Sequence, residues 1–316
     1  MSELAVHTRA LSKSYDGVLA VDSLDLQVPR NSVFGFLGPN GAGKTTTMKM
    51  LLGLIRPTSG SGSIFGLDIA TESPEVRRRI GYLPQDPRFY PHMTARETLR
   101  FAAGFFFSGP SAGIEARIDE MLDMVGLIGR ADRPVKTLSG GETQRLGIAQ
   151  AQIHQPDLLI LDEPAAALDP LGRRDVLEIL ERLRATSTVF YSTHILDDVQ
   201  RVSDVVCILK GGRIVSQGPL ADVLGAGSES VFVVVVAGDG QAARSALLGQ
   251  DWVEQVDVAG GPAEATLRIT VKDAEVATAR LQRVLLSDEA LVIKEFRRPT
   301  STLEDVFVDL VEEGDG

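Results

Sequence analysis

The sequence predicts an α/β protein whose main domain is built around a mostly parallel β-sheet. Two observations carry this prediction. Short apolar segments such as Leu158–Leu161 alternate with longer helical stretches, and strands buried on both faces are typical of parallel sheets. A glycine-rich loop, Gly38–Thr45, stands between an apolar segment and a helical stretch, as a phosphate-binding loop does.

The N-terminal third predicts strands first and helices later. The expected elements are edge strands Leu4–Leu11 and Leu19–Gln27 with a turn at Asp16-Gly17, a buried strand Val33–Leu37, a helix Thr45–Leu54 and a hairpin at Gly60–Gly66. Residues 72–130 are expected to be mainly helical, as Pro74–Arg79, Thr94–Phe107 and Ile114–Val125. Thr94 with Glu97 three residues later predicts a capping box at the start of the second of these helices.

The middle of the chain repeats the alternation of apolar strands and helices. The expected strands are Leu158–Leu161, Thr188–Ser192 and Val205–Leu209, with helices at Gly172–Ala185 and Ile195–Val202. A different pattern begins near residues 222–229, so we expect domains at 1–221 and 222–316. The tail predicts a small α+β domain with a split βαβ arrangement: strands Val231–Val236, Trp252–Val258, Ala265–Val271 and Leu291–Phe296, helices Gln241–Leu248 and Ala274–Leu286, and a final helix Thr302–Val311 capped by Ser301 and Glu304.

Charge divides at the same place as the pattern. The 316 residues carry a net charge of −11. Residues 1–221 hold 24 basic and 25 acidic side chains, whereas residues 222–316 hold 8 and 18. An acidic chain is a poor general binder of nucleic acid, because such binding rests on basic patches. The acidity belongs almost entirely to the second domain.

Three further features set expectations about the compartment. The single cysteine, Cys207, excludes a disulfide within the chain and favours a reducing compartment. The longest aliphatic stretch, around Val231–Ala237, is far shorter than the ~20 residues that span a bilayer. The first ten residues lack the apolar core of a signal peptide. We therefore expect a cytosolic protein that does not itself cross a membrane.

Three motifs carry the chemistry. In Gly38–Thr45 the glycines let backbone N–H groups turn toward phosphate oxygens, while Lys44 can reach the β- and γ-phosphates and the Thr45 hydroxyl can bind Mg²⁺. Asp162 and Glu163 end an apolar strand, where the first can hold Mg²⁺ and the second can polarise water. Ser139–Gly141 opens a helix and predicts a second anion site, which suggests a nucleotide shared between two chains, although a plain helix cap would also explain it.

In this order, GPNGAGKT, LSGGE, LLILDEP, Ala167-Leu168-Asp169 and Ser192-Thr193-His194 resemble the ATP-binding subunit of ABC transporters over residues 4–220. The resemblance implies an ABC ATPase fold with an antiparallel β subdomain and a helical subdomain at about residues 86–155. It also implies a head-to-tail homodimer that holds Mg·ATP between the phosphate loop of one copy and the Ser139–Gly141 turn of the other. The residues implied to bind nucleotide are Tyr15, Gly38, Pro39, Asn40, Gly41, Ala42, Gly43, Lys44, Thr45, Thr46, Ser139, Gly140, Gly141 and Asp169.

The same resemblance assigns roles to single residues. Tyr15 stacks on adenine, Asp169 links the two active sites, and Glu163 and His194 are catalytic. Gln85 contacts Mg²⁺ and water and senses a membrane partner, so that Mg²⁺ is expected at Thr45, Gln85 and Asp162. The stretch Pro164–Asp169 departs slightly from the family pattern, with alanines at 165 to 167 where threonine and glycine are common. No catalytic side chain is lost by this departure.

A separate membrane subunit is implied to dock near Gln85–Thr94, with Arg88, Phe89, Tyr90 and His92 as the surface candidates. Phe101 and Phe105–Phe107 are expected mostly inside the helical subdomain. The segment Arg298–Phe307 resembles the accessory domain of drug- and antibiotic-resistance exporters, which favours export from the cytoplasmic face of the membrane. The alternatives are an ABC ATPase acting on nucleic acid or ribosomes and a regulatory switch that binds nucleotide without hydrolysis.

Overall fold

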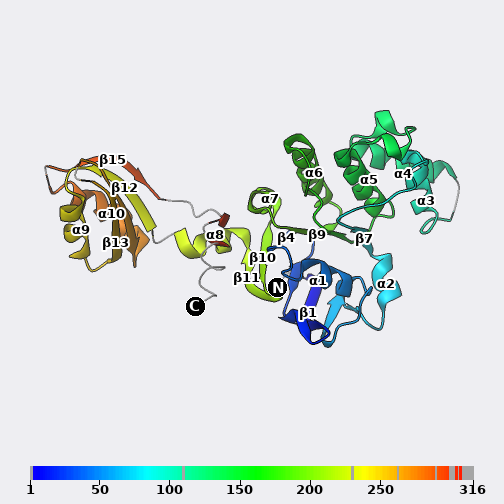
Figure 1. Ribbon diagram of the computed structural model, residues 1–316, viewed down its shortest axis with the longest axis horizontal. Helices are drawn as coiled ribbons and strands as arrows, with labels where there is room; N and C mark the ends of the chain where they lie inside the picture. The colour runs from blue at the N-terminus through cyan, green and yellow to red at the C-terminus, as the bar shows by residue number, and fades with distance from the viewer. Residues whose placement is uncertain are drawn as a thin grey trace. The chain divides into compact units, whose positions relative to one another are not determined.

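The computed structural model describes residues 3–108, 111–228, 231–261, 263–288, 290–298, 303, 304, 306 and 307. The chain divides into two compact units, Met1–Leu220 and Ala221–Gly316. Figure 1 shows the elements of each unit. The first unit contains all of the motifs described above.

A six-stranded sheet forms the centre of the first unit. Its order is β11 (Arg213–Pro219), β10 (Val205–Lys210), β4 (Val33–Leu37), β9 (Thr188–Thr193), β8 (Leu158–Leu161) and β7 (Ile80–Leu83). Only the β10–β11 pair is antiparallel. Every residue of β4, β8 and β9 is buried, as expected of strands covered on both faces. The predicted α/β fold with a mostly parallel sheet is confirmed.

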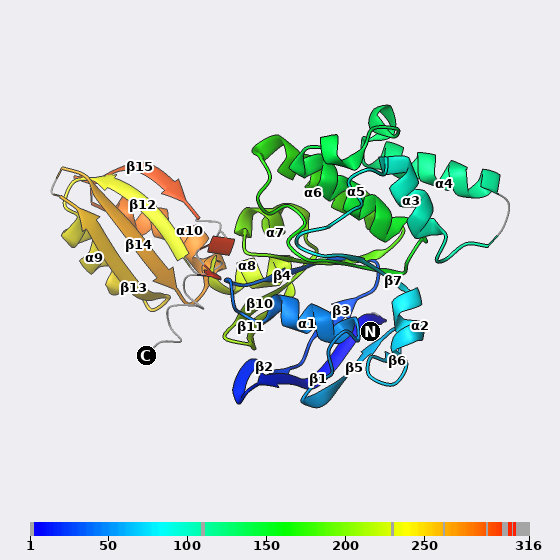
Figure 2. The same cartoon turned by 45° about the vertical axis from the view of Figure 1, so that its right-hand side comes forward.

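An antiparallel sheet lies on one side of the central sheet (Figure 2). It consists of β2 (Val18–Leu24), β1 (Leu4–Tyr15), β5 (Ser59–Ile64) and β6 (Leu67–Asp68), with β3 (Gln27–Pro29) also paired to β1. Helix α1 (Lys44–Leu51) lies on the same side. One apolar core, which includes Val6, Phe36 and Met48, joins both sheets to α1. Because α1 begins where the phosphate loop ends, this core also fixes the position of the loop.

The remaining helices of the first unit lie mostly on the opposite side of the central sheet (Figures 1 and 2). They are α3 (Ala95–Ala103), α4 (Ser111–Met124), α5 (Gly140–Gln152), α6 (Pro170–Leu183) and α7 (Leu196–Val202), with short turns η1 (Ile128–Arg130) and η2 (Val135–Thr137). The capping box of Thr94 and Glu97 is confirmed at the start of α3. Helix α8 (Leu220–Ser228) follows β11.

Several predicted boundaries were wrong. The strand expected at Leu19–Gln27 is divided into β2 and β3, while β1 continues to Tyr15. The helix expected at Pro74–Arg79 is present as α2 (Ser73–Arg78), but the prediction for residues 72–130 missed strand β7, which follows α2. Strand β7 has only four residues and contains Gly81, where a Cβ atom would lie 2.0 Å from the Ala151 carbonyl oxygen. Close packing against α5 thus requires glycine at this position. Glycine weakens the apolar sequence pattern from which a strand is predicted.

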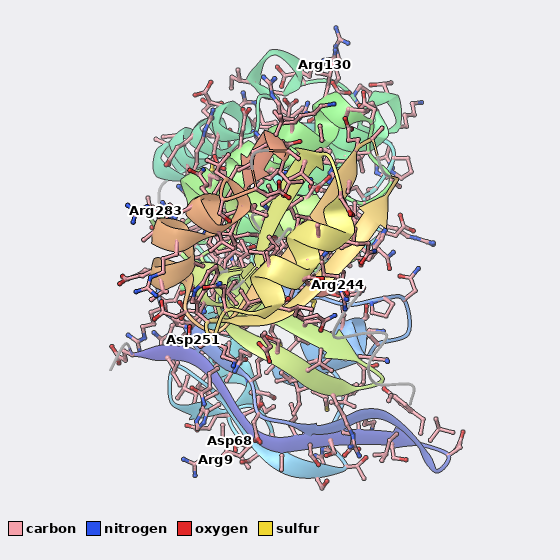
Figure 3. The ribbon with its side chains drawn as sticks, turned by 90° about the vertical axis from the view of Figure 1, so that its left-hand side faces the viewer. Arg9, Asp68, Arg130, Arg244, Asp251 and Arg283 are labelled. Atoms are coloured by element: carbon pink, nitrogen blue, oxygen red, sulfur yellow. The ribbon has the colours of Figure 1, made fainter. Side chains whose placement is uncertain are left out.

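In the described part of the second unit, a four-stranded antiparallel sheet carries the helices α9 and α10. Its elements are β12 (Val231–Ala237), α9 (Gly240–Leu248), β13 (Val253–Gly260), β14 (Ala265–Val271), α10 (Ala274–Leu285) and β15 (Val292–Arg297), with strand order β13-β14-β12-β15. Strand β14 separates β12 from β13, which confirms the split βαβ prediction. Figure 3 shows α9 and α10, with Arg244 on the first and Arg283 on the second.

The predicted final helix is described in part. Leu303, Glu304, Val306 and Phe307 are helical, whereas Ser301, Thr302 and the last residues up to Val311 lie outside the described residues, as does the predicted capping box. Of the helices that the structure describes, none has both the length and the apolar character needed to cross a bilayer.

Cys207 offers a test of the central sheet. The side chain lies in β10 with no exposed surface, and burial raises the pKa of its thiol. A maleimide at pH 8 should label the folded chain at least about a hundredfold more slowly than the urea-unfolded chain, because only the exposed thiolate reacts. Equal labelling rates, followed by mass spectrometry, would contradict the buried position of this strand.

Candidate functional site

The carboxyl ends of three adjacent parallel strands bring the candidate residues together. Strands β4, β9 and β8 are paired so that Leu37 lies opposite Thr193 and Leu161 lies opposite Tyr191. The segments that follow these strands therefore leave the sheet at one edge. This edge is where open α/β sheets bind ligands.

The phosphate loop holds Lys44 in a buried position. Its Nζ atom donates to the carbonyl oxygens of Gly38 at 2.5 Å and Pro39 at 3.3 Å. The same atom lies 3.2 Å from Oε1 of Glu163, and both side chains are less than a tenth exposed. Nζ is thus surrounded by oxygen atoms, the ligand type that a phosphate group would supply.

Two glycines make the loop possible. A Cβ atom at Gly38 would lie 2.5 Å from the Leu209 carbonyl oxygen, so only glycine permits this approach to β10. Gly43 has a φ of +103°, and a Cβ atom there would lie 2.5 Å from the Ala20 carbonyl oxygen. Gly43 is also the residue before α1, where backbone N–H groups have no intrahelical partner. The loop is therefore suited to bind an anion.

Thr45 and Asp162 form the candidate metal site. The Thr45 hydroxyl donates to Oδ2 of Asp162 at 2.9 Å, and Ser192 Oγ donates to Oδ1 at 2.6 Å. Burial raises the pKa of the nearby Tyr82, and the negative charge of Asp162 raises it further. Within the described residues, no group of three or more His, Cys, Asp or Glu side chains could form a metal site. One hydroxyl and one carboxylate fit Mg²⁺, which takes few protein ligands when phosphates and water complete its shell.

Glu163 is held in a strained and buried position. Its backbone φ is +50°, in the left-handed region that a residue with a side chain adopts only under constraint. Its N–H donates to Ser192 Oγ at 2.9 Å, and its carboxylate lies between Lys44 and His194. His194 Nδ1 lies 2.9 Å from Glu163 Oε2, with the imidazole 45% exposed. The exposed ring can reach a ligand while the carboxylate stays covered.

The structure does not bring all predicted residues to this edge. Helix α5 begins after Ser139, whose Oγ accepts from the Glu142 N–H in a capping box, and α5 lies across the central sheet from α1 (Figure 1). Among the described residues, the Ser139–Gly141 turn makes no hydrogen bond to the phosphate loop or to Glu163. Asp169 caps α6 through the Gly172 N–H. Both therefore have structural roles within one chain.

The other predicted residues lie at the margin of the site. Tyr15 ends β1 and is 45% exposed, on the hairpin whose Ala20 and Val21 approach Gly43. Gln85 is exposed two residues after β7, next to the strand that ends in Asp162. Pro39, Asn40 and Gly41 are exposed at the loop tip, Ala42 is buried, and Thr46 is half-buried in the first turn of α1.

The sequence did not single out Ser192 as a site residue. Its hydroxyl links Asp162 to the backbone of Glu163, and the side chain is fully buried. A serine next to the carboxyl end of a fully buried strand, two residues before His194, was the available signal. This residue orients the Asp162 carboxylate and holds the backbone of Glu163.

Comparison with known proteins agrees with the site. The sequence profile of the family described as ABC transporter matches residues 21–166. The chain is 40% identical over 311 residues to an uncharacterized ABC transporter ATP-binding protein of Bacillus subtilis (strain 168), covering 96% of this chain and 98% of that one. It is 42% identical to a bacitracin transport ATP-binding protein of Bacillus licheniformis, covering 68% and 69%. The dimeric ATP-binding cassette MJ0796 bound to ADP and phosphate superposes with a TM-score of 0.63 at 26% identity, covering 68% and 98%.

The two glycines with positive φ in the loop provide a matched pair of variants. Gly41→Ala meets no atom within 4 Å, so it should carry only the backbone strain of about 1 kcal/mol. Gly43→Ala adds the contact with the Ala20 carbonyl oxygen and should lower both the melting temperature and the affinity for ATP more strongly. Thermal unfolding and binding of a fluorescent ATP analogue measure these effects. Equal losses in the two variants would show that the close approach is unimportant.

Proposed function

This chain is an ATP-binding subunit of the ABC transporter family, and we propose that two copies of it hydrolyse Mg·ATP to drive export through a separate membrane protein. Hydrolysis of ATP and its use in transport belong to the family as a whole. The observation that carries the proposed mechanism is the buried contact of Glu163 with Lys44 on one side and His194 on the other.

The reaction begins with an exchange of partners at Lys44. Phosphate oxygens of ATP replace Glu163 at Nζ, while the N–H groups at the start of α1 bind the β-phosphate. Glu163 then accepts a proton from the water that attacks the γ-phosphorus, because its carboxylate no longer neutralises Lys44. The bond from the γ-phosphorus to the oxygen shared with the β-phosphate breaks in the same step, and ADP leaves. His194 keeps Glu163 in place and contacts the γ-phosphate. Tyr15 stacks on the adenine ring.

The chain's own residues fit the Mg²⁺ of the nucleotide. Thr45, Asp162 and Gln85 would hold it, and Mg²⁺ would neutralise phosphate charge. Thr45 and Asp162 are already within 2.9 Å of each other, and Ser192 fixes the carboxylate. Gln85 would complete the site from the neighbouring strand.

A head-to-tail dimer would give Ser139–Gly141 its ligand. This turn begins a helix of 13 residues, and Ser139 and Gly140 are exposed. An exposed helix start favours an anion even where a capping box satisfies some of its N–H groups, yet the phosphate loop of the same chain lies across the sheet. The γ-phosphate of a nucleotide held by a second copy would supply the anion that the phosphate loop of the same chain is too distant to present. The dimeric form of MJ0796 supports this arrangement.

The membrane subunit would dock in a groove of about 390 Å³. Strand β7 and helices α3 and α5 form it, and its lining includes Tyr82, Phe101, Phe105, Phe106 and His154. Phe101 and Phe105 are 50% and 73% exposed, so the prediction that this aromatic run is mostly core is wrong. The helix ends at Ala103, which releases the later rings to the surface. A helix with an apolar face would fit this groove.

The groove adjoins the predicted docking stretch. Tyr90 is 57% exposed and packs edge-on against Phe101, with ring centres 6.0 Å apart. His92 lies beside Tyr90. Gln85 follows β7 and so connects the groove to the metal site. Docking here would hold the chain at the cytoplasmic face of the membrane.

The second unit bears on the direction of transport. The bacitracin transport protein is similar over 68% of the chain, whereas the Bacillus subtilis relative is similar over nearly the full length. We assign residues 222–316 to an acidic accessory domain of an exporter. Its net charge of −10, given by 8 basic and 18 acidic residues, would keep it away from an anionic membrane surface.

Glu163→Gln tests the assignment of the base. The amide cannot accept a proton from water, so the steady-state rate of ATP hydrolysis should fall by at least about a hundredfold, while ATP still binds. ATP should then accumulate the dimer in size-exclusion chromatography. Glu178→Gln, on the exposed face of α6, is the control and should hydrolyse ATP normally. Hydrolysis at the unmodified rate in Glu163→Gln would refute the proposed base.

The docking groove is tested by a pair of aromatic substitutions. Phe105→Asp places a charge in the groove and should prevent co-purification with the multi-span membrane protein that accompanies the unmodified chain. ATP hydrolysis by the isolated chain should remain. Phe107→Asp is the matched control, because Phe107 is exposed in the same run but does not line the groove. Ribosomes or nucleic acid co-purifying instead would contradict transport.

A further inference from the structure

An ion pair joins α6 to α7. Helix α6 follows the strand that leads to the acidic pair, and α7 follows the strand that leads to the histidine. Arg173 lies in the first turns of α6, and Asp198 lies in the first turn of α7. We infer that this ion pair is a positioning contact that couples the two ATP sites of the dimer. The inference rests on the head-to-tail arrangement proposed above.

The contact is short and shielded from water. Arg173 Nε donates to Asp198 Oδ1 at 2.6 Å, with side-chain exposures of 29% and 2%. The second carboxylate oxygen, Oδ2, is buried with no hydrogen-bond partner. Removal of Arg173 would leave a buried charge without compensation, which is far more costly than the loss of an exposed pair. The position of α6 against α7 is therefore strongly specified.

The start of α6 lies beside the turn assigned to the partner's nucleotide. Arg173 is four residues after Asp169, which caps the helix. A Cβ atom at Gly141 would lie 3.9 Å from both Gly172 Cα and Leu168 Cδ2. The start of α6 is thus packed against the Ser139–Gly141 turn. A shift of α6 would move Asp169 and this turn together.

Helix α7 belongs with the chain's own nucleotide site. It begins two residues after His194. A Cβ atom at Gly35, in the strand that leads to the phosphate loop, would lie 2.7 Å from Ser203 Oγ and 3.0 Å from Val199. Ser203 also shares a 2.9 Å hydrogen bond with Tyr191 of β9. Helix α7 is consequently packed against β4, which leads into the phosphate loop that holds Lys44, and against β9, which leads to His194.

The ion pair therefore connects α6 and the Ser139–Gly141 turn directly to α7 and the chain's own nucleotide site. A second contact between the two helices, from Arg201 of α7 to Glu178 of α6, is longer at 3.8 Å and more exposed, at 44% and 38%, so it contributes less than the buried pair. Arg174 pairs with Glu178 on the same helix. Displacement of His194 by a bound γ-phosphate would reach the Ser139–Gly141 turn through α7, Asp198 and Arg173. Hydrolysis in one site would in this way depend on the occupant of the other.

The experiment compares Arg173→Met with Arg174→Met. The first removes the bridge, whereas the second removes a neighbouring guanidinium whose side chain is 61% exposed. In Arg173→Met the kcat for ATP hydrolysis should fall about tenfold with a KM within about twofold of the unmodified value. The Hill coefficient should fall toward 1. Arg173→Lys should restore part of both, and Arg174→Met should match the unmodified chain.

Asp198→Asn provides a second variant if Arg173→Met does not fold. Its side chain keeps the shape and loses the charge, and it should also lower the Hill coefficient. The inference is overturned if folded Arg173→Met or Asp198→Asn keeps the unmodified kcat and Hill coefficient, or if kcat falls only in proportion to ATP affinity. A separate control adds ATP to Glu163→Gln alone. Failure of that variant to dimerise would refute the head-to-tail dimer itself.

Discussion

The parallel pairing of β4, β9 and β8 is the constraint on which the site depends. Three strands from distant parts of the chain end side by side, and each delivers a different group: the phosphate loop, the acidic pair and the histidine. Because all three strands are fully buried, the edge cannot shift without loss of the core. Precise placement of the chemistry therefore comes from apolar packing that takes no part in it.

Electrostatics add a second layer of organisation. The single buried lysine of the edge is neutralised by Glu163 in the chain alone, and the nearby Asp162 is satisfied by the Thr45 and Ser192 hydroxyls. ATP and its metal can replace the partner in each of these interactions. No buried polar or charged group is then left without an interaction when the nucleotide binds. The left-handed backbone at Glu163 shows that the fold holds this carboxylate against its local preference. The site is organised before the nucleotide arrives.

Local sequence signals predicted the core elements and the candidate residues that meet at the carboxyl edge of the sheet, because the phosphate loop and the acidic pair are each contiguous in the sequence. Strand β7 could not be predicted in the same way, since four residues with a central glycine owe their conformation to pairing with β8 and packing on α5. The aromatic run at 101–107 was placed in the core because hydrophobicity alone does not show where a helix ends. Ser192 gained its importance only from contacts with residues 29 and 30 positions earlier.

The exposed rings of Phe101 and Phe105 also bear on how the subunit must be produced. If the membrane subunit docks here as proposed, these rings remain uncovered in every copy that has no membrane partner. Copies made in excess would meet one another, chaperones and proteases through the same rings. Under the proposed docking, balanced synthesis of the two subunits would keep this groove covered, and the lifetime of the ATPase in the cell would report how much membrane subunit is present to receive it.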